Sequence, residues 1–336
     1  MIRVGIVGAT GYTAVELLKI LLRHPEVSVT AITSRDPKTP HLSEVHPSLR
    51  DQLNLNFSQL DIPSFCKSVD VAFCCLPHAA SAAIVGQLVD AGVRVVDFSA
   101  DYRLNDVETF EKWYGVEHPD AGRVGNVAYG IPELFRSEIK SADVVANPGC
   151  FPSSALLPLA PLLKADLIQA APIIVDSKTG ISGAGRKTNL KFHYPECNES
   201  ISAYGIGTHR HMPEIDQIIK RFCGADIETV FTPHLTPMDR GILSTIYVQP
   251  KSKTNESDVM DCWNDYYKDE KFVRISNDLV ATKNVSGTNF CDINARACRG
   301  TIVIVSALDN LVKGASGAAV QNFNVMHDFD DTLGML

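Results

Sequence analysis

The first half of the chain alternates short apolar runs with segments of helical periodicity. Ile2 to Val7 is rich in β-branched residues, as is typical of a buried strand. After a glycine-containing turn, apolar residues recur at helical spacing as far as Leu22. This order continues with further apolar runs at Val27 to Thr33, Val69 to Cys75, Val93 to Phe98 and Ala142 to Ala146. One stretch of helical periodicity, Ala79 to Asp90, lies between two of these runs. The alternation predicts an α/β fold with a parallel, doubly wound sheet of the Rossmann type.

The second half has longer β-rich runs separated by turns, at Ile173 to Ser177, Thr229 to Thr232, Ile242 to Gln249 and Gly300 to Ala307. They predict an α+β substrate domain with a mixed or antiparallel sheet. A helix of small residues between 309 and 323 is expected to pack back against the first domain. We therefore expect a coenzyme-binding domain of residues 1–149 and 310–336, and a catalytic domain of residues 150–309. Residues 249–257 form the most solvated connection.

Composition narrows the class of protein. A chain of 336 residues, 45% hydrophobic and 21% charged, is long enough for two domains with buried cores. We find no signal-peptide pattern and no apolar run near 18 residues, so no membrane association is expected. The net charge of −8, with scattered Lys and Arg, argues against a nucleic-acid partner. Nine cysteines, an odd number without a CxxC pair, indicate a reducing, cytoplasmic compartment and no structural zinc.

A glycine turn near the N-terminus is the first candidate site. Gly5, Gly8 and Gly11 lie between the first predicted strand and helix, with the spacing G-x-x-G-x-x-G. Glycines at such a place let a pyrophosphate approach the backbone at a helix N-terminus, although they also occur in ordinary tight turns. We expect dinucleotide contacts from the turn residues Gly8, Thr10, Gly11, Tyr12 and Thr13.

The end of the second strand indicates which dinucleotide is bound. An NAD site usually has Asp or Glu there, whereas this chain has Ser34 and Arg35. A cation with a hydroxyl suits a 2′-phosphate, so NADP is favoured, with a solvated surface arginine as the alternative. Leu76, Pro77 and Ser99 follow later strands, at the sheet edge where ligands bind in such folds.

Cys150 is the candidate nucleophile. It follows Asn147-Pro148-Gly149, where Pro148 and Gly149 end a short strand and an apolar helix begins. Free backbone N–H groups at a helix start lower a thiol pKa from about 8.5 towards about 3.5–7.5, and the thiolate is the reactive form. The alternative is a small buried apolar residue at a helix start.

Two histidines, His209 and His211, precede a helix predicted to open at Pro213 and Glu214. In an extended segment, side chains two residues apart point the same way, so both imidazoles are expected to face one cleft. A general base beside the cysteine is the favoured use. A metal site with Glu214 or His234 as third ligand, or two surface histidines, are the alternatives.

Residues 177–186, Ser177-Lys178-Thr179-Gly180-Ile181-Ser182-Gly183-Ala184-Gly185-Arg186, follow a predicted strand. Their glycines, hydroxyls and cations are suited to a backbone nest for an anion, with a flexible loop as the alternative.

The motifs as a set resemble one family over nearly the whole chain and in the same order. They are Gly8-Ala9-Thr10-Gly11-Tyr12, Ser99-Ala100-Asp101-Tyr102-Arg103-Leu104, Asn147-Pro148-Gly149-Cys150, Ser182-Gly183-Ala184-Gly185-Arg186, His209-Arg210-His211-Met212-Pro213-Glu214-Ile215 and Asp309-Asn310-Leu311-Val312-Lys313-Gly314. The chain resembles the N-acetyl-gamma-glutamyl-phosphate reductases of arginine biosynthesis, which belong to the semialdehyde dehydrogenase group.

The resemblance implies NADPH-dependent reduction of N-acetyl-gamma-glutamyl phosphate to the semialdehyde, with phosphate release, through a thioester on Cys150. It implies that a histidine of the His209-Arg210-His211 segment assists Cys150; we favour His209 as the base, with His211 facing the substrate anion. Further coenzyme contacts are expected from Gly183, Asn310 and Lys313. Substrate contacts are expected from Arg103, Ser182, Arg186 and Glu214. The partners are then a small acyl phosphate and further copies of the chain, in a dimer or tetramer.

Two other functions remain open from the sequence. A related semialdehyde dehydrogenase would act on aspartyl phosphate or on an aminoadipate derivative held by a carrier protein, but the sequence has no basic patch for a carrier. A redox-responsive NADP-binding regulator would use the fold without turnover. Such a sensor needs neither the histidine pair nor residues 182–186.

Overall fold

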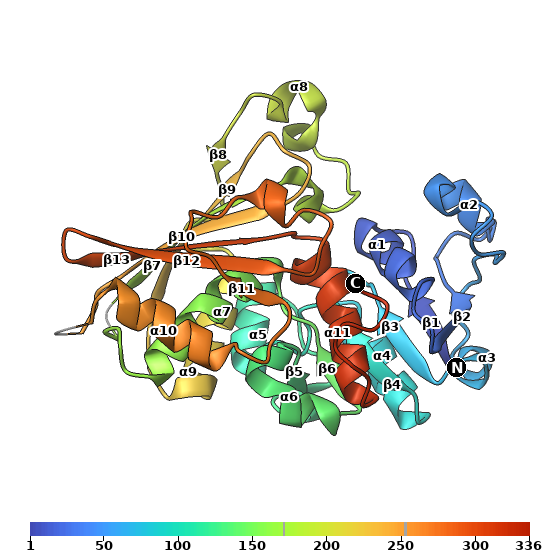
Figure 1. Ribbon diagram of the computed structural model, residues 1–336. Coiled ribbons are helices and arrows are strands. Elements are labelled where there is room, and N and C mark those ends of the chain that lie inside the picture. The colour runs from blue at the N-terminus through green and yellow to red at the C-terminus, as the bar shows by residue number, and fades with distance from the viewer. Residues whose placement is uncertain (171, 252–253) are drawn as a thin grey trace. The chain divides into compact units, whose positions relative to one another are not determined.

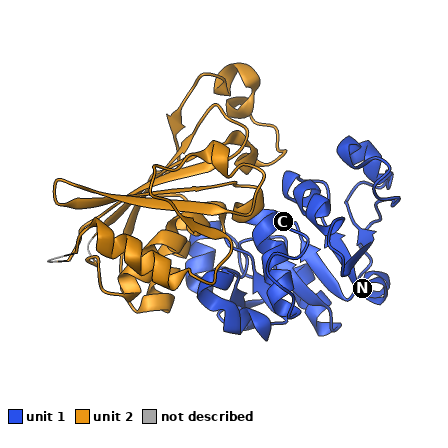
Figure 2. Ribbon diagram, viewed as in Figure 1, with its two compact units in different colours: residues 1–148, 315–336 blue, residues 149–314 orange. Residues whose placement is uncertain are grey.

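The computed structural model describes residues 1–170, 172–251 and 254–336, which form two compact units (Figure 2). Unit 1 comprises residues 1–148 and 315–336, and unit 2 comprises residues 149–314. Residues 310–314, which we placed in the first domain from the sequence, group with unit 2. Two residues of the predicted solvated connection, 252 and 253, lie outside the described residues. Within these described ranges, no helix combines the length and the apolar character that a membrane span requires.

Unit 1 is built on a six-stranded parallel sheet (Figure 1). The strand order is β2-β1-β3-β4-β6-β5, and every neighbouring pair is parallel. The strands are β1 (Ile2–Val7), β2 (Val27–Ile32), β3 (Val71–Cys74), β4 (Arg94–Asp97), β5 (Ala128–Tyr129) and β6 (Val144–Ala146). The predicted doubly wound sheet is confirmed, with strand ends shifted by one or two residues from the apolar runs.

Two groups of helices pack around this sheet. Helices α1 (Tyr12–Leu21), α6 (Pro132–Lys140) and α11 (Gly317–Met326) form one group, and α3 (Ile62–Ser68) and α4 (Ala82–Asp90) form another. Helices α2 (Leu42–Val45) and α5 (Val107–Tyr114) lie in connections. Helix α11 is completely buried and contacts α1, α6 and β4, which confirms that the small-residue helix returns to the first domain.

Unit 2 is built on a seven-stranded mixed sheet with the order β11-β12-β13-β10-β7-β9-β8, as predicted. The pairs β7/β9 and β11/β12 are parallel and the others antiparallel. The strands are β7 (Ile173–Thr179), β8 (Ser202–Ala203), β9 (Thr229–Leu235), β10 (Ile242–Val248), β11 (Val273–Ile275), β12 (Cys291–Cys298) and β13 (Thr301–Leu308).

Three helices of unit 2 contact the sheet: α7 (Cys150–Lys164), α9 (His211–Cys223) and α10 (Glu256–Tyr266). Helix α8 (Tyr194–Cys197) is a single exposed turn, and a π-helical turn, η6 (Val312–Ser316), leads towards α11. Short 3-10 turns are η1 (Pro47–Leu49), η2 (Ala121–Arg123), η3 (Ile181–Ala184), η4 (Leu190–Phe192) and η5 (Thr282–Asn284).

One face of this sheet carries an exposed apolar row. Ile174 pairs with Val230 on one side and with Tyr247 on the other, so the three side chains are neighbours across β9, β7 and β10. They are 43%, 49% and 38% exposed. Residues adjacent to them along these strands, such as Val175 and Phe231, are buried on the opposite face. The alternation leaves apolar surface on the side of the sheet that faces away from its own core.

Candidate active site

Cys150 is the first residue of α7, as predicted. Gly149 precedes it in an extended conformation and caps the helix without a side-chain hydrogen bond. The rest of α7 is buried as far as Leu163, whereas the Cys150 thiol is only half-buried. Because backbone N–H groups at a helix start favour negative charge, this placement favours a thiolate that reagents can reach.

Gly149 is enclosed by two side chains of α9. Its N–H donates to Glu214 Oε1 at 2.9 Å, and a Cβ built on Gly149 would lie 2.5 Å from His211 Nε2. Only glycine leaves room for the imidazole at this distance. The first turn of α9 is therefore packed against the start of α7, which places His211 beside the residue that precedes Cys150.

A second glycine, Gly314, packs against Cys150 from η6. A Cβ on Gly314 would lie 2.7 Å from the Cβ of Cys150. The Gly314 N–H donates to the Asp309 carbonyl at 2.9 Å, so the end of β13 holds this glycine. The terminal Lys-Gly motif thus forms one wall around the thiol.

The two histidines lie together, with ring centroids 4.8 Å apart, but for a reason other than the one we expected. The segment before α9 is a turn rather than an extended strand, and His211 is itself the first residue of the helix. His209 packs edge-on against Phe151, Tyr204 and Phe231 at centroid distances of 5.5, 5.6 and 5.2 Å. Aromatic packing, not strand alternation, brings the imidazoles together.

His209 is held as a neutral ring. Burial, with a smaller contribution from the nearby charge of Arg210, lowers the pKa of His209 to about 4. Its Nδ1 accepts the backbone N–H of His211 at 3.2 Å, which leaves the ring proton on Nε2. The nitrogen that carries the free electron pair is therefore occupied by a backbone donor.

Tyr204 is a site residue that sequence reasoning missed. Burial raises its pKa, and the charge of Cys150 raises it further, so the phenol lies near the thiol and stays protonated. Residue 204 carries no motif and approaches Cys150 only through the fold, so no local signal identified it.

Glu214, which we expected at the substrate, is buried and its Oε1 accepts the Gly149 N–H. This bond joins the Glu214 side chain to the backbone before Cys150. His234, the alternative metal ligand, lies 3.1 Å from Asp176. Among the described residues no group of three or more His, Cys, Asp or Glu side chains could hold a metal ion.

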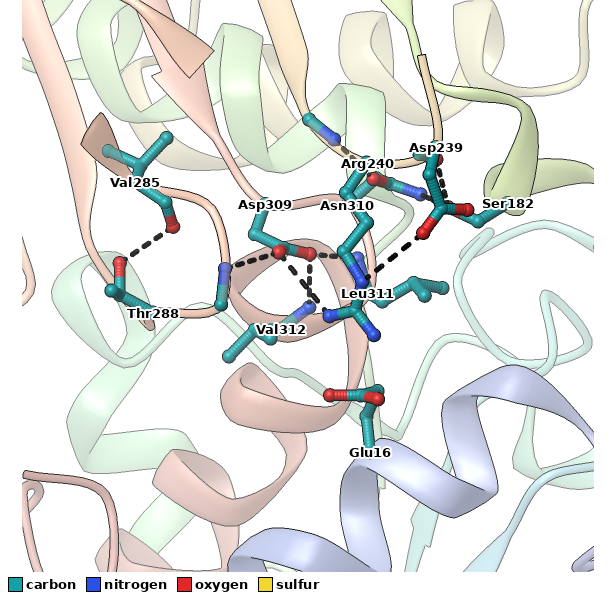
Figure 3. A network of polar contacts seen from close by, with 12 residues as sticks. Glu16, Ser182, Asp239, Arg240, Val285, Thr288, Asp309, Asn310, Leu311 and Val312 are labelled. Carbon is teal, nitrogen blue, oxygen red and sulfur yellow. Dashed lines mark hydrogen bonds and ion pairs between the residues drawn. The ribbon is translucent and has the colours of Figure 1, made fainter. Parts of the chain in front are cut away.

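The predicted anion loop is fixed by a polar network in unit 2 (Figure 3). Ser182 Oγ donates to the Asp239 carbonyl at 2.5 Å and accepts from Asn310 Nδ2 at 3.0 Å. Asn310 Oδ1 in turn accepts the Gly241 N–H at 2.7 Å. The structure thus brings Ser182 and Asn310 together. Gly183 is exposed, and a Cβ built on it would lie 3.6 Å from Asn310 Nδ2.

Asp309 is the centre of the same network and was not predicted. Its buried carboxylate accepts N–H groups from Leu311, Val312 and Gly287, and lies 3.5 Å from the Arg240 guanidinium (Figure 3). These bonds fix the turn between β13 and η6. Two predicted ligand contacts of unit 2 differ in exposure. Lys313, expected at the coenzyme, is buried with its ammonium 5.6 Å from the Phe272 ring centre, whereas Arg186, expected at the substrate, is exposed.

The glycine turn in unit 1 has the room that a pyrophosphate needs. Gly8 has φ +79°, and a Cβ on it would lie 2.8 Å from Leu76 Cδ2 and 2.9 Å from the Cys75 carbonyl. Gly11 caps α1 without a side chain, and a Cβ there would meet only Thr13 Oγ1 at 3.8 Å. The backbone is compact at Gly8 and open at Gly11, so these residues fit a dinucleotide phosphate.

Thr33 connects this turn to the end of β2, because it accepts the Gly8 N–H on its hydroxyl and the Ala9 N–H on its carbonyl. Ser34 and Arg35 follow directly, the first half-buried and the second exposed. A cavity of about 430 Å³ opens beside them, lined by Asp36, Lys38, Thr39, Pro40, His41, Glu44, Val45 and Asn56.

Arg103, a predicted substrate ligand, is buried in unit 1. It donates to the carbonyls of Asn147 and Phe98, both at 2.8 Å. These bonds join the ends of β6 and β4. Ser99, also buried, donates to Asp97 Oδ2 at 2.6 Å. Pro77, by contrast, is exposed.

Two family models cover most of the chain. Residues 3–142 match the semialdehyde dehydrogenase NAD binding domain, and residues 150–310 match the semialdehyde dehydrogenase dimerisation domain. Among solved structures, aspartate semialdehyde dehydrogenase II of Vibrio cholerae has a TM-score of 0.75 at 16% identity, covering 98% of both chains. The Candida albicans enzyme, solved with NADP, has a TM-score of 0.73 at 14% identity, covering 97% of this chain and 98% of that one. At such identities the likeness is one of fold.

Curated relatives are similar over their whole length. The N-acetyl-gamma-glutamyl-phosphate reductase of Rhodopirellula baltica is 54% identical, and that of Geotalea daltonii 46% identical. Each alignment covers 100% of this chain and 98% of the relative. Identity at this level over the full length establishes the family. The chain belongs to the N-acetyl-gamma-glutamyl-phosphate reductase family of the semialdehyde dehydrogenases.

Proposed function

We propose that this protein reduces N-acetyl-gamma-glutamyl phosphate to N-acetylglutamate semialdehyde with NADPH, releasing phosphate, in arginine biosynthesis. The observation that carries the proposal is the packing of His211 on Gly149, one residue before a cysteine at the start of α7. Family membership supports the substrate, and this geometry supports Cys150 as the nucleophile with a histidine partner.

The Cys150 thiolate attacks the acyl carbon, its Sγ forms the new bond, and the bond from that carbon to the phosphate oxygen breaks. Phosphate leaves with the electron pair, and the acyl group stays on Cys150 as a thioester. A covalent nucleophile divides one difficult substitution into two easier steps. Backbone N–H groups in the first turn of α7 stabilise the oxyanion of each tetrahedral species.

We assign the base role to His211 rather than to His209, which we favoured from the sequence. His209 is neutral with a pKa of about 4, and its Nδ1 is occupied by a backbone N–H. His211 presents Nε2 to Gly149 beside the thiol. It takes the thiol proton and passes it to the departing phosphate, while His209 packs behind it and orients its ring.

The coenzyme site fits the residues of the glycine turn. When bound, NADPH supplies a hydride to the thioester carbon. Gly8 lets the turn pack against Leu76 and Cys75, and Gly11 leaves the backbone open to the pyrophosphate. Thr10, Tyr12 and Thr13 flank the pyrophosphate, and Ser34 and Arg35 meet the 2′-phosphate. The Candida albicans enzyme of the same fold was solved with NADP, which supports this choice over NAD. Contacts from Leu76, Pro77, Ser99, Gly183, Asn310 and Lys313 stay predictions.

After reduction, the tetrahedral species on Cys150 collapses to the aldehyde and releases the thiolate, which takes a proton from solvent. Overall, one proton and one hydride enter for each phosphate released. Substrate anion contacts from Arg103, Ser182, Arg186 and Glu214 also stay predictions. Of these, Arg186 is the exposed cation, and Ser182, Arg103 and Glu214 are hydrogen-bonded within the protein.

Mass spectrometry tests the proposal directly. Wild-type protein mixed with N-acetyl-gamma-glutamyl phosphate, without coenzyme, should carry an acyl adduct on the peptide containing Cys150. Added NADPH should remove the adduct while semialdehyde forms. An adduct on another cysteine would overturn the mechanism. If aspartyl phosphate formed the adduct and the N-acetylated substrate did not, the function of the related dehydrogenase would replace the one proposed.

We also propose that the chain forms a homodimer through the open face of the unit 2 sheet. The match to a dimerisation domain and the exposed row of Ile174, Val230 and Tyr247 support this surface. Tyr247→Asp should reduce the mass measured by light scattering to that of a monomer. Val116→Asp, at a side chain of similar exposure in unit 1, is the control and should leave the mass unchanged. An unchanged mass for Tyr247→Asp would exclude this face.

All nine cysteines lie within the described residues and are reduced rather than paired in disulfide bonds. This supports a reducing compartment and, with the biosynthetic reaction, a cytoplasmic location.

A further inference from the structure

The carboxylate of Asp101 is completely buried and holds the start of α4 from outside that helix. Its Oδ1 accepts the Ala79 N–H at 2.7 Å, and its Oδ2 accepts those of Ser81 and Ala82, both at 3.0 Å. The helix's own N-cap residue, Ser81, makes no side-chain cap bond. A residue about twenty positions away thus satisfies N–H groups that a local cap normally serves.

A second buried carboxylate, Asp97, fixes Asp101 in turn. Ser81 Oγ and Ser99 Oγ each donate to Asp97 at 2.6 Å, and the Asp101 N–H donates to Ser99 Oγ at 3.1 Å. Ser81 therefore binds one aspartate by its backbone and the other by its hydroxyl. The end of β4 and the start of α4 are joined by a closed ring of hydrogen bonds.

The segment between β3 and α4 is strained where this ring holds it. Ala79 has φ +63°, a left-handed conformation that costs a residue with a Cβ roughly 1–2 kcal/mol. The Ala100 N–H donates to His78 Nδ1 at 3.0 Å, which adds a further link to the same loop. At its other end the loop borders the glycine turn, because Leu76 Cδ2 lies 2.8 Å from a Cβ built on Gly8.

We propose that Asp101 is a positioning residue for coenzyme binding, an inference that rests on the proposed coenzyme site at Leu76 and Pro77. Its carboxylate draws the N–H groups of Ala79, Ser81 and Ala82 inward and keeps residue 79 left-handed. This conformation fixes the direction in which the chain leaves Leu76 and Pro77. Without the carboxylate, residue 79 relaxes to negative φ, and the loop moves relative to the glycine turn.

The test compares Asp101→Asn with Asp106→Asn. Asparagine at 101 keeps one acceptor oxygen but directs an amide NH₂ at the remaining N–H donors. Asp106 is the matched control, because it also caps a helix of unit 1, α5, by accepting the Thr109 N–H at 2.7 Å. We expect Asp101→Asn to raise the dissociation constant of NADP⁺ and the KM for NADPH at least tenfold. The kcat at saturating coenzyme should stay within threefold of wild type. The pH profile of Cys150 alkylation should not shift.

A second variant separates this role from a general loss of stability. Ala79→Gly adopts positive φ without strain, so the double variant Asp101→Asn with Ala79→Gly should regain most of the NADP⁺ affinity. Unchanged NADP⁺ affinity in folded Asp101→Asn would overturn the inference. So would a loss that Ala79→Gly does not relieve or that Asp106→Asn reproduces. If wild-type protein does not bind NADP⁺, the proposed function fails. Equal binding by wild type and variant is a different result, because it overturns only the role of Asp101.

Discussion

The imidazole of His211 lies against the α-carbon of Gly149, so closely that a methyl group there would be 2.5 Å from Nε2. The same glycine gives its N–H to Glu214, one turn further along α9. Two helix starts are thereby packed into one site, and the side chain that is absent at residue 149 is what allows it. The first prediction follows from this contact.

Gly149→Ala should lower kcat/KM for the acyl phosphate at least 100-fold, because about 2.7 kcal/mol of transition-state stabilisation is lost when His211 is displaced. The KM for NADPH should not change. Steady-state kinetics with each substrate varied will measure both. Gly122→Ala is the control, since a Cβ at Gly122 meets nothing within 4 Å. Full activity of Gly149→Ala would mean that His211 can move away without cost.

Replacement of each histidine by asparagine should distinguish their roles. His211→Asn should slow acylation and shift the pH at which Cys150 reacts with an alkylating agent upward, because the Cys150 thiol loses the base that accepts its proton. His209→Asn should change that pH little, since His209 is already neutral above pH 4 and its unprotonated Nδ1 accepts the His211 N–H. The opposite pattern would return the base role to His209.

Arg35→Asp should weaken NADP binding by about 1.5–3 kcal/mol, the size of a charged hydrogen bond, and improve the relative use of NAD. Arg35 is exposed at the end of β2, so the change should not disturb folding. Arg50→Asp makes the same charge change at another exposed position of unit 1 and serves as the control. Equal NADP affinity in wild type and Arg35→Asp would leave Arg35 as a solvated surface residue.

The sequence predicted what depends on neighbours along the chain. The order of β1, glycine turn and α1, and the position of Cys150 at a helix start, follow from local patterns. Contacts made across the fold were not accessible in the same way. Tyr204 and Asp309 reach the site through tertiary packing, and Arg103 and Glu214 form hydrogen bonds with backbone groups that periodicity cannot identify.

The shifted pKa of Asp97 predicts how the stability of the folded protein depends on pH. Burial raises its pKa from 3.8 to about 6, although hydroxyls of Ser81 and Ser99 oppose the shift. The folded protein therefore binds this proton more tightly than the unfolded chain does. The stabilisation that this group contributes is fully present below pH 4 and is lost as the pH rises towards 6. Over that window its loss is on the order of 2–3 kcal/mol.

Asp97→Asn removes the titration, and an amide can still exchange hydrogen bonds with both serine hydroxyls. Relative to wild type, the Tm of Asp97→Asn should therefore rise between pH 4 and pH 6.5 and then stay level. Groups common to both proteins cancel in this difference. Asp106→Asn is the opposite control, because hydrogen bonds from the Thr109 hydroxyl and N–H lower the pKa of Asp106, so its contribution to stability is lost as the pH falls. A Tm difference for Asp97→Asn that does not vary with pH would mean that Asp97 is already ionised at pH 4 in the folded protein.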